Sequence, residues 1–149
     1  WELAQRPEGA QLIRAIAPTI GQPHQEYTDG PGKTSLLPAL LITGINDPVV
    51  PPGNWGTLGF STSEGNDAYN FATASEITKS WAEAHNCNTD NEPAPFDDGY
   101  TESDCRGWCE TENGNWPLVL DCRANMGHDF QIAWEWPLVL DFFDFWSVQ

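Results

Sequence analysis

Two residues of this chain, Asp47 and His128, have the chemistry of a proton-transfer pair. Asp47 follows the apolar run at 36–44, and His128 comes much later, directly after Gly127. An imidazole that takes a proton from a nucleophile needs a carboxylate that fixes its tautomer and stabilises the imidazolium. If the two residues work together, their side chains are expected to lie about 2.6–3.2 Å apart.

Each residue also has an interpretation without chemistry. Asp47 lies in an Asn-Asp-Pro sequence that initiates turns by itself. His128, next to Asp129, could belong to a polar loop with no special role. The joint occurrence of strand, glycine, aspartate and proline, then a helix, then strand, glycine and histidine favours the acid–base interpretation.

The nucleophile of such a site is missing from the sequence. Acid first and histidine second is the order in which an α/β-hydrolase supplies the last two members of a Ser-Asp-His triad. No G-x-S-x-G motif occurs, and residues 1–6 have the pattern of a helix interior. We therefore expect residues 1–149 to be the C-terminal part of one α/β-hydrolase domain, with the N-terminal strands and the serine lying before Trp1.

Hydrophobic periodicity predicts the elements that position these residues. Strands are expected at 12–17, 39–43 and 118–120, and helices at 1–6, 70–85 and 137–146, the last with Pro137 in its first turn. The alternation of strands and helices predicts an α/β fold in which a parallel sheet carries helices on both faces.

Four cysteines, Cys87, Cys105, Cys109 and Cys122, all lie in a polar excursion at about 86–122. Their spacing lacks the paired C-x-x-C knuckles of a zinc site, so we expect two disulfides and no metal. Three pairings are possible, of which we favour Cys87 with Cys105 and Cys109 with Cys122. Disulfides indicate an oxidising compartment, hence a secreted or extracellular protein.

Charge excludes two classes of partner. The sequence has 22 acidic residues against 6 Lys plus Arg, a formal charge of −16. Phosphate backbones and anionic headgroups both require positive patches, so nucleic-acid and membrane-surface binding are not expected. The apolar stretches are also far shorter than the ~20 residues that span a bilayer.

The segment 40–51, Leu-Leu-Ile-Thr-Gly-Ile-Asn-Asp-Pro-Val-Val-Pro, resembles the acid-bearing turn of a family of secreted esterases: polyhydroxybutyrate depolymerases, feruloyl esterases and acetylxylan esterases. The similarity continues through 12–21, through 81–87 and through Gly127-His128. It implies a carboxylic-ester hydrolase in which an upstream serine attacks the ester, His128 acts as base and then acid, and Asp47 orients His128. It implies no metal or organic cofactor.

Two departures from that family limit what the resemblance implies. Thr43 stands where members commonly have a histidine, and Asp129-Phe130 follow His128 where members commonly have Trp and Pro. The second change falls in the expected substrate cleft, so the particular ester, polymeric or small, is left open. The number of copies that assemble is also left open.

Aromatic residues in the long loop at 46–66 are candidates for substrate contact. Trp55 and Phe60 are predicted to bind a polymer or an aromatic acyl group by stacking. A rival interpretation is a non-enzymatic extracellular structural or glycan-binding protein that reuses part of a hydrolase fold, since fold does not determine function. The missing nucleophile and the 8 tryptophans favour that rival.

Overall fold

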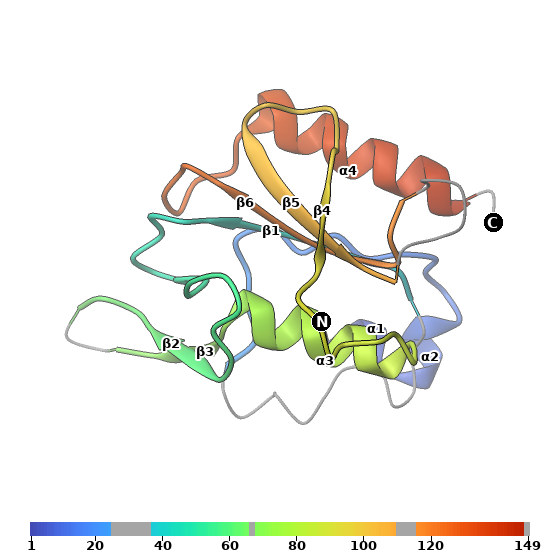
Figure 1. The fold of residues 1–149 in the computed structure, drawn as a ribbon, viewed down its shortest axis with the longest axis horizontal. Helices are drawn as coiled ribbons and strands as arrows, with labels where there is room; N and C mark the ends of the chain where they lie inside the picture. Colours follow the sequence, from blue (N-terminus) through green and yellow to red (C-terminus); the bar gives the residue numbers. More distant parts are fainter. Residues whose placement is uncertain (25–36, 66–67, 110–115, 148–149) are drawn as a thin grey trace.

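The computed structural model describes residues 1–24, 37–65, 68–109 and 116–147 as an α/β fold (Figure 1). The helices are α1 (Glu2–Gln5), α2 (Pro7–Ala10), α3 (Ala74–Ala84) and α4 (Ile132–Ser147). The strands are β1 (Ala39–Gly44), β2 (Phe60–Thr62), β3 (Asn70–Ala72), β4 (Ala94–Phe96), β5 (Ser103–Trp108) and β6 (Val119–Ala124).

The main sheet has the strand order β1-β6-β5-β4. β1 and β6 are parallel, in a register that pairs Thr43 with Arg123, whereas β5 and β4 run antiparallel to their neighbours. The expectation of a wholly parallel sheet is therefore wrong for its outer half. The reason is that the polar excursion returns as a hairpin, and antiparallel strands need only a short connection.

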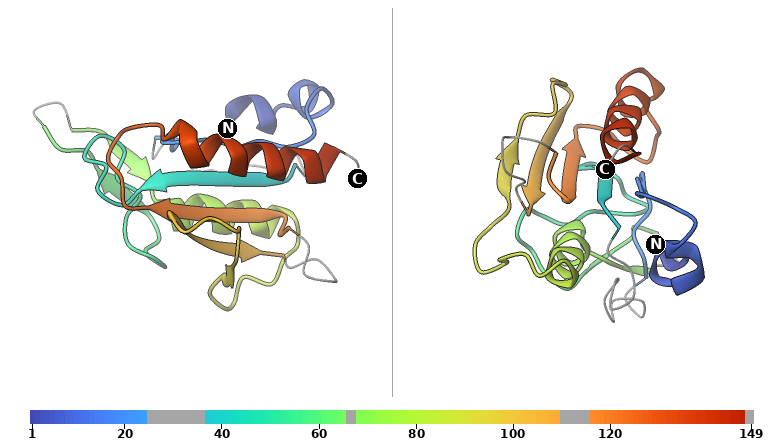
Figure 2. Two further views of the ribbon diagram at one scale, coloured as in Figure 1. Left: turned by 90° about the horizontal axis from the view of Figure 1, so that it is seen from above. Right: turned by 90° about the vertical axis from the view of Figure 1, so that its right-hand side faces the viewer.

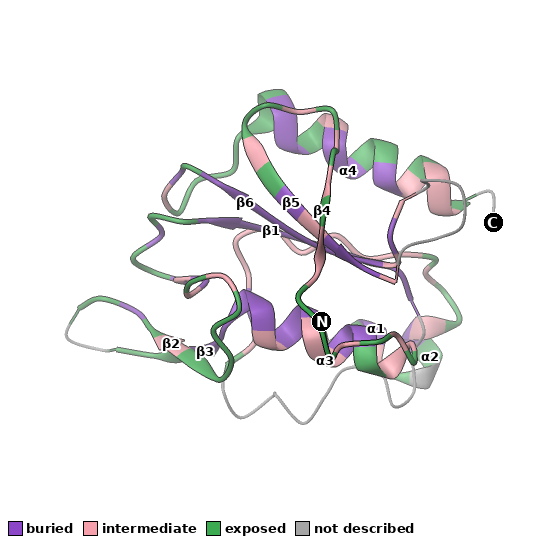
Figure 3. Cartoon of the chain, in the orientation of Figure 1, coloured by how far each residue is buried: buried purple, intermediate pink, exposed green. Residues whose placement is uncertain are grey.

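Helices cover both faces of this sheet. α4 lies on one face, and α3 lies on the other together with α1 and α2 (Figure 2). All six residues of β1 and of β6 are buried, as the purple strands of Figure 3 show. Because successive side chains of a strand point to opposite faces, each of these strands contributes to two separate cores.

The first predicted strand is displaced. No regular strand forms at 12–17; instead, Ile16 and Thr19 make isolated parallel bridges to Ala39 and Ile42 of β1. Pro18 accounts for the irregularity, because proline has no N–H to donate to a sheet. The segment 16–20 therefore forms one edge of the sheet next to β1.

Two predicted helices have different bounds in the structure. The expected helix at 70–85 begins only at Ala74, because residues 70–72 pair with β2 as β3 and Thr73 caps the helix by accepting a hydrogen bond from Glu76 N–H. α4 begins at Ile132, so Pro137 lies inside the helix rather than in its first turn. The helix can begin this early because the buried Glu135 carboxylate accepts the N–H of Gln131, a backbone donor that has no partner within the helix.

Candidate active site

The turn that carries Asp47 begins where β1 ends. Two backbone hydrogen bonds, from Ile45 N–H to Ala124 O at 2.9 Å and from Asn46 N–H to Met126 O at 3.1 Å, join it to the loop that follows β6. The Asp47 carboxylate is buried, with 3% of the residue exposed. Its Oδ1 accepts the N–H groups of Val49 at 2.8 Å and Val50 at 2.9 Å. Asp47 is thus fixed by its own turn, with Oδ2 left for another donor.

Gly44 allows the two turns to approach each other. A Cβ at this position would lie 2.5 Å from the carbonyl oxygens of both Met126 and Gly127. Those atoms belong to backbone and cannot rotate away as a side chain could. Any residue larger than glycine would therefore push apart the loops that carry Asp47 and His128.

His128 lies across this junction with its Nδ1 2.8 Å from Asp47 Oδ2. Since an ionised carboxylate can only accept, Nδ1 carries the proton and donates it. The side chain of Asp47 is fully buried, whereas 41% of the His128 side chain is exposed. The imidazole is consequently held at Nδ1, and no described hydrogen bond engages its Nε2.

What this arrangement can do chemically is accept and return a proton at Nε2. A buried carboxylate that orients an imidazole and stabilises its charged form is the function of the acid in a nucleophile-activating site. Among the described residues, no hydroxyl or thiol makes a hydrogen bond to Nε2. The described residues therefore contain an acid–imidazole pair with the geometry that such a site needs, and no nucleophile in contact with it.

Trp55 and Phe60, the two aromatic residues predicted to contact substrate, lie in different environments. Trp55 is half-buried, and its ring packs against the guanidinium groups of Arg123, 3.8 Å from the ring centroid, and Arg106, at 4.3 Å. Phe60 is 50% exposed on β2. The β2–β3 hairpin projects from the end of the molecule toward which β1 and β6 point (Figure 2). Substrate contact by Trp55 and Phe60 stays a prediction.

A buried charged pair near the site was not predicted. Asp121 and Arg123 in β6 are 1% and 3% exposed and form an ion pair of 2.8 Å. Burial raises the pKa of Asp121, and the hydrogen bond and positive charge of Arg123 oppose that rise. The signal in the sequence was two opposite charges two positions apart in an apolar strand, which places both on one face.

The predicted cysteine pairing is wrong, although two disulfides form. Cys105 pairs with Cys122 and Cys87 pairs with Cys109, with Cα–Cα distances of 4.0 and 5.3 Å. The antiparallel register of β5 and β6 places Cys105 directly opposite Cys122, which spacing along the sequence does not reveal. Asp98 lies close to Cys105 and Cys122, but their sulfurs are joined to each other and are not free thiolates.

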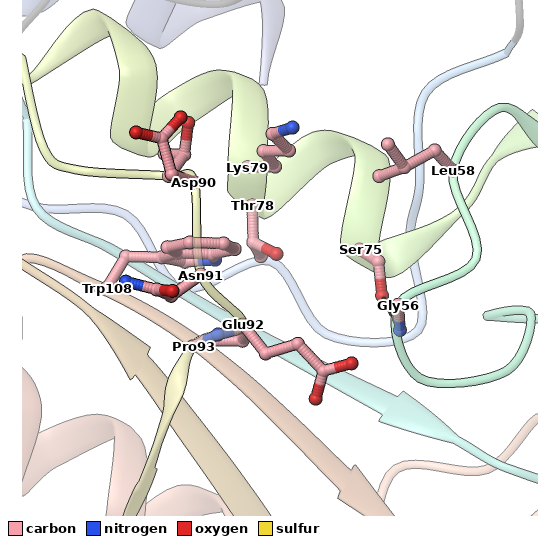
Figure 4. A pocket seen from close by; sticks show the side chains of 11 residues that line it. Gly56, Leu58, Ser75, Thr78, Lys79, Asp90, Asn91, Glu92, Pro93 and Trp108 are labelled. Atoms are coloured by element: carbon pink, nitrogen blue, oxygen red, sulfur yellow. Dashed lines mark hydrogen bonds between the residues drawn. The ribbon is translucent and has the colours of Figure 1, made fainter.

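A pocket of about 180 Å³ lies between α3 and the segment that follows it (Figure 4). Its walls include Ser75 and Thr78 of α3, Glu92 and Trp108. Neither Asp47 nor His128 lines it, so it is separate from the acid–histidine pair.

Within the described residues, every helix is too short or too polar to span a bilayer.

No protein-family model matches this chain, and no curated protein or solved structure shows significant similarity to it. The resemblance to secreted esterases in the sequence accordingly stays a hypothesis. Any functional assignment depends on the geometry of the chain itself, and above all on the contact between Asp47 and His128.

Proposed function

We propose that this chain is the acid- and histidine-bearing part of a secreted serine esterase. The observation that carries the proposal is the 2.8 Å contact between His128 Nδ1 and the buried carboxylate of Asp47. In this proposal, a serine upstream of Trp1 attacks the carbonyl of the ester. His128 takes the serine proton at Nε2 and passes it to the leaving alcohol, which leaves the acyl group on the serine. His128 then takes a proton from the water that attacks this acyl-serine and gives it back to the serine oxygen, and Asp47 stabilises the imidazolium in both halves of the reaction.

One feature supports this proposal over a role of His128 as a metal ligand. A metal site would need at least two further ligand side chains close to Nε2. Among the described residues, the one group of three potential ligands that lie close together consists of Asp98, Cys105 and Cys122, and does not include His128. The free nitrogen is therefore better suited to moving a proton.

The substrate class proposed is a polyester, a feruloyl ester or an acetyl ester, and it comes from the sequence resemblance. The partial α/β-hydrolase fold is proposed on the same basis, supported by the adjacent parallel strands β1 and β6, which are followed by the turns that carry Asp47 and His128. In such sheets, active sites lie at the carboxyl ends of the strands. Two disulfides are compatible with an extracellular location.

A second candidate function is a structural or glycan-binding protein without catalysis. The observation that favours it is that no described hydroxyl contacts His128 Nε2. Exposed aromatic side chains on the β2–β3 hairpin, Phe60 at 50% and Tyr69 at 57%, would suit a binding surface. In this case the acid–histidine pair would only brace two loops.

Labelling with a fluorophosphonate probe, read together with the intact mass, separates the two candidates. The esterase is expected to be longer than the 16.5 kDa of this chain and to be labelled on a serine. Asp47→Asn should lower kcat on an ester by roughly 10⁴-fold, because the wrong tautomer of His128 is then favoured. Asp144→Asn, the matched control, removes an exposed carboxylate on α4, outside the candidate site, and should leave kcat unchanged.

An unlabelled protein with the mass of this chain would contradict the esterase and favour the binding role. Equal losses of kcat in the Asp47 and Asp144 variants would also contradict it, because the loss would then not depend on the contact between Asp47 and His128.

A further inference from the structure

We propose that Arg123 is a positioning residue that holds the loop of Asp47 in register with the strand that leads to His128. The inference rests on the proposed function, because it assigns Arg123 a role in the same site. Arg123 lies near the end of β6, opposite Thr43 of β1, and 2% of its side chain is exposed. Its guanidinium group does not touch His128; it acts through the segment that follows Asp47.

The guanidinium group makes three different kinds of contact at once. Nε and Nη2 donate to the Asp121 carboxylate, at 3.1 and 2.8 Å. Nη1 donates to the carbonyl oxygen of Gly53 at 2.8 Å, and Nη2 donates to Ser75 Oγ at 2.9 Å. The group thus connects β6, the loop that follows Asp47, and the first turn of α3.

Ser75 extends this connection to the other end of the same loop. Its Oγ accepts the N–H of Gly56 at 3.0 Å, and the ring of Trp55 lies over the Arg123 guanidinium. The segment 53–56 is therefore held at Gly53, at Trp55 and at Gly56 by one cluster of side chains. At its start, the loop is held by the N–H groups of Val49 and Val50 on the Asp47 carboxylate.

The two anchors make the position of Asp47 depend on β6. His128 follows β6, and Asp47 follows β1. Without Arg123, the described contacts that join the two loops directly are the backbone bonds of Ile45 and Asn46, an amide contact between Asn46 and Asn125, and the His128–Asp47 bond itself. Arg123 adds a further connection, from β6 to Gly53 in the later part of the loop that follows Asp47.

The shape of arginine matters here, beyond its charge. A buried ion pair loses about as much through desolvation as it gains, so stability alone is a poor reason for its presence. The planar guanidinium donates in several fixed directions, whereas a lysine ammonium is a compact point charge. Lysine at position 123 would keep the charge next to Asp121 and could not reach Asp121, Gly53 and Ser75 together.

The test measures the proton that His128 Nδ1 donates to Asp47, which gives a far-downfield signal in the proton NMR spectrum. Its disappearance in Asp47→Asn assigns it among the 3 histidines. We expect Arg123→Lys to increase the exchange of this proton with water at least about tenfold. On an ester, kcat should fall on the order of 100-fold with KM little changed, as expected for a misplaced catalytic group.

Arg106→Lys is the matched control. Arg106 also packs on Trp55, and its ion pair is with Glu92, not with the segment 53–56. Its NMR signal and kcat should remain those of the parent protein. Ser75→Ala removes one anchor without touching the ion pair and should give an intermediate increase in proton exchange.

The double variant Asp121→Leu/Arg123→Met separates positioning from folding. It removes both buried charges together, so the fold is expected to survive, while the connection to Gly53 is lost. A stable double variant with fast proton exchange supports the proposal. An unchanged signal in both Arg123→Lys and the double variant would overturn it. Because this signal does not require turnover, failure of the esterase assignment would appear separately, as absence of fluorophosphonate labelling.

Discussion

The two faces of the central sheet are made by the same strands and differ in chemistry, because the α4 face is apolar whereas the α3 face combines an apolar cluster with a buried polar one. On the α4 face, Leu40, Ile42 and Leu120 of the sheet pack with Leu138 of α4 in an apolar core that includes the disulfide of Cys105 and Cys122. On the other face, alternation along β1 and β6 places Thr43, Asp121 and Arg123 on the side of α3, where Arg123 donates to Ser75. An apolar cluster that includes Ala39, Trp81 and Val119 covers the rest of this face.

This difference shows how the molecule separates stability from precision. Apolar burial is strong and has no preferred direction, so the α4 face can hold the fold together without fixing any loop. Hydrogen bonds depend on angle and distance, so the polar contacts on the α3 face specify where the segment 53–56 lies. The acid–histidine pair lies beyond the ends of β1 and β6. Its position depends both on the apolar packing of these strands and on the directional hydrogen bonds of the α3 face.

Arg123→Met is expected to have the largest effect on stability. It leaves Asp121 buried without its partner, and the free energy of unfolding should fall by about 3–5 kcal/mol. Urea unfolding followed by tryptophan fluorescence measures this loss. Asp121→Leu/Arg123→Met should recover most of it. Equal destabilisation of the single and double variants would contradict this prediction, because the loss would then not come from leaving Asp121 without its partner.

Removal of either disulfide compares the two faces directly. Cys105→Ala/Cys122→Ala opens a link between residues 17 apart, which should lower the free energy of unfolding by about 3 kcal/mol. Cys87→Ala/Cys109→Ala opens a link of similar span, 22, and should cost less, because those cysteines are only half-buried. Thermal unfolding of the two double variants gives the order, and the reverse order would contradict it.

Thr73→Ala is expected to have a smaller effect, at the start of α3. The Thr73 hydroxyl accepts the N–H of Glu76 at 3.2 Å and donates to the carbonyl of Thr57 at 2.6 Å. Its loss should lower the free energy of unfolding by about 1 kcal/mol. Thr73→Ser keeps both bonds and should be close to the parent protein in chemical denaturation. Equal losses in both variants would mean that the methyl group, and not the cap, is responsible.

Glu135→Gln should have the smallest effect, and one that depends on pH. Burial raises the pKa of Glu135, and the hydrogen bond from Gln131 N–H opposes that rise. For an acid whose pKa is raised in the folded protein, the contribution to stability declines as pH increases through that pKa. Glu135→Gln should therefore gain stability relative to the parent at pH 7 and lose this advantage below about pH 4.

Unfolding measured at several pH values checks the Glu135 prediction. Asp144→Asn, which removes an exposed carboxylate from the same helix, should show no such trend. A Glu135→Gln advantage that grew toward acid pH would mean that the carboxylate is stabilised as an anion in the fold.

Some elements could be predicted because their sequence carries a strong local pattern. β1 is an apolar run, and α3 has an apolar stripe. β6 begins in the apolar run predicted at 118–120 but continues to Ala124 through Asp121 and Arg123. β4 and β5 were missed because Ala-Pro-Phe and Ser-Asp-Cys-Arg-Gly-Trp contain little β-branched or alternating apolar character. β5 becomes a strand through pairing with β6, and β4 through pairing with β5. The pairing of β5 with β6 also determines which cysteines meet.

The candidate site, like the fold, could be predicted only in part. Asp47 and His128 could be brought together on paper because parallel neighbouring strands end at the same edge, and their 2.8 Å contact lies in the expected range. Arg123 could not be connected to Gly53, because the contact depends on three-dimensional packing between residues far apart in sequence. The catalytic role of the pair stays a proposal.

Alternation in β6 also limits how this strand can evolve. Arg123 and Cys122 are adjacent, yet one faces the loop of Asp47 and the other is bonded to β5. Deletion or insertion of a single residue within the strand would move its side chains to the opposite face of the sheet. The guanidinium group would then face the apolar core, and Cys122 would face away from Cys105. Point replacements in β6 would disturb one layer of the molecule, whereas an indel would disturb both at once.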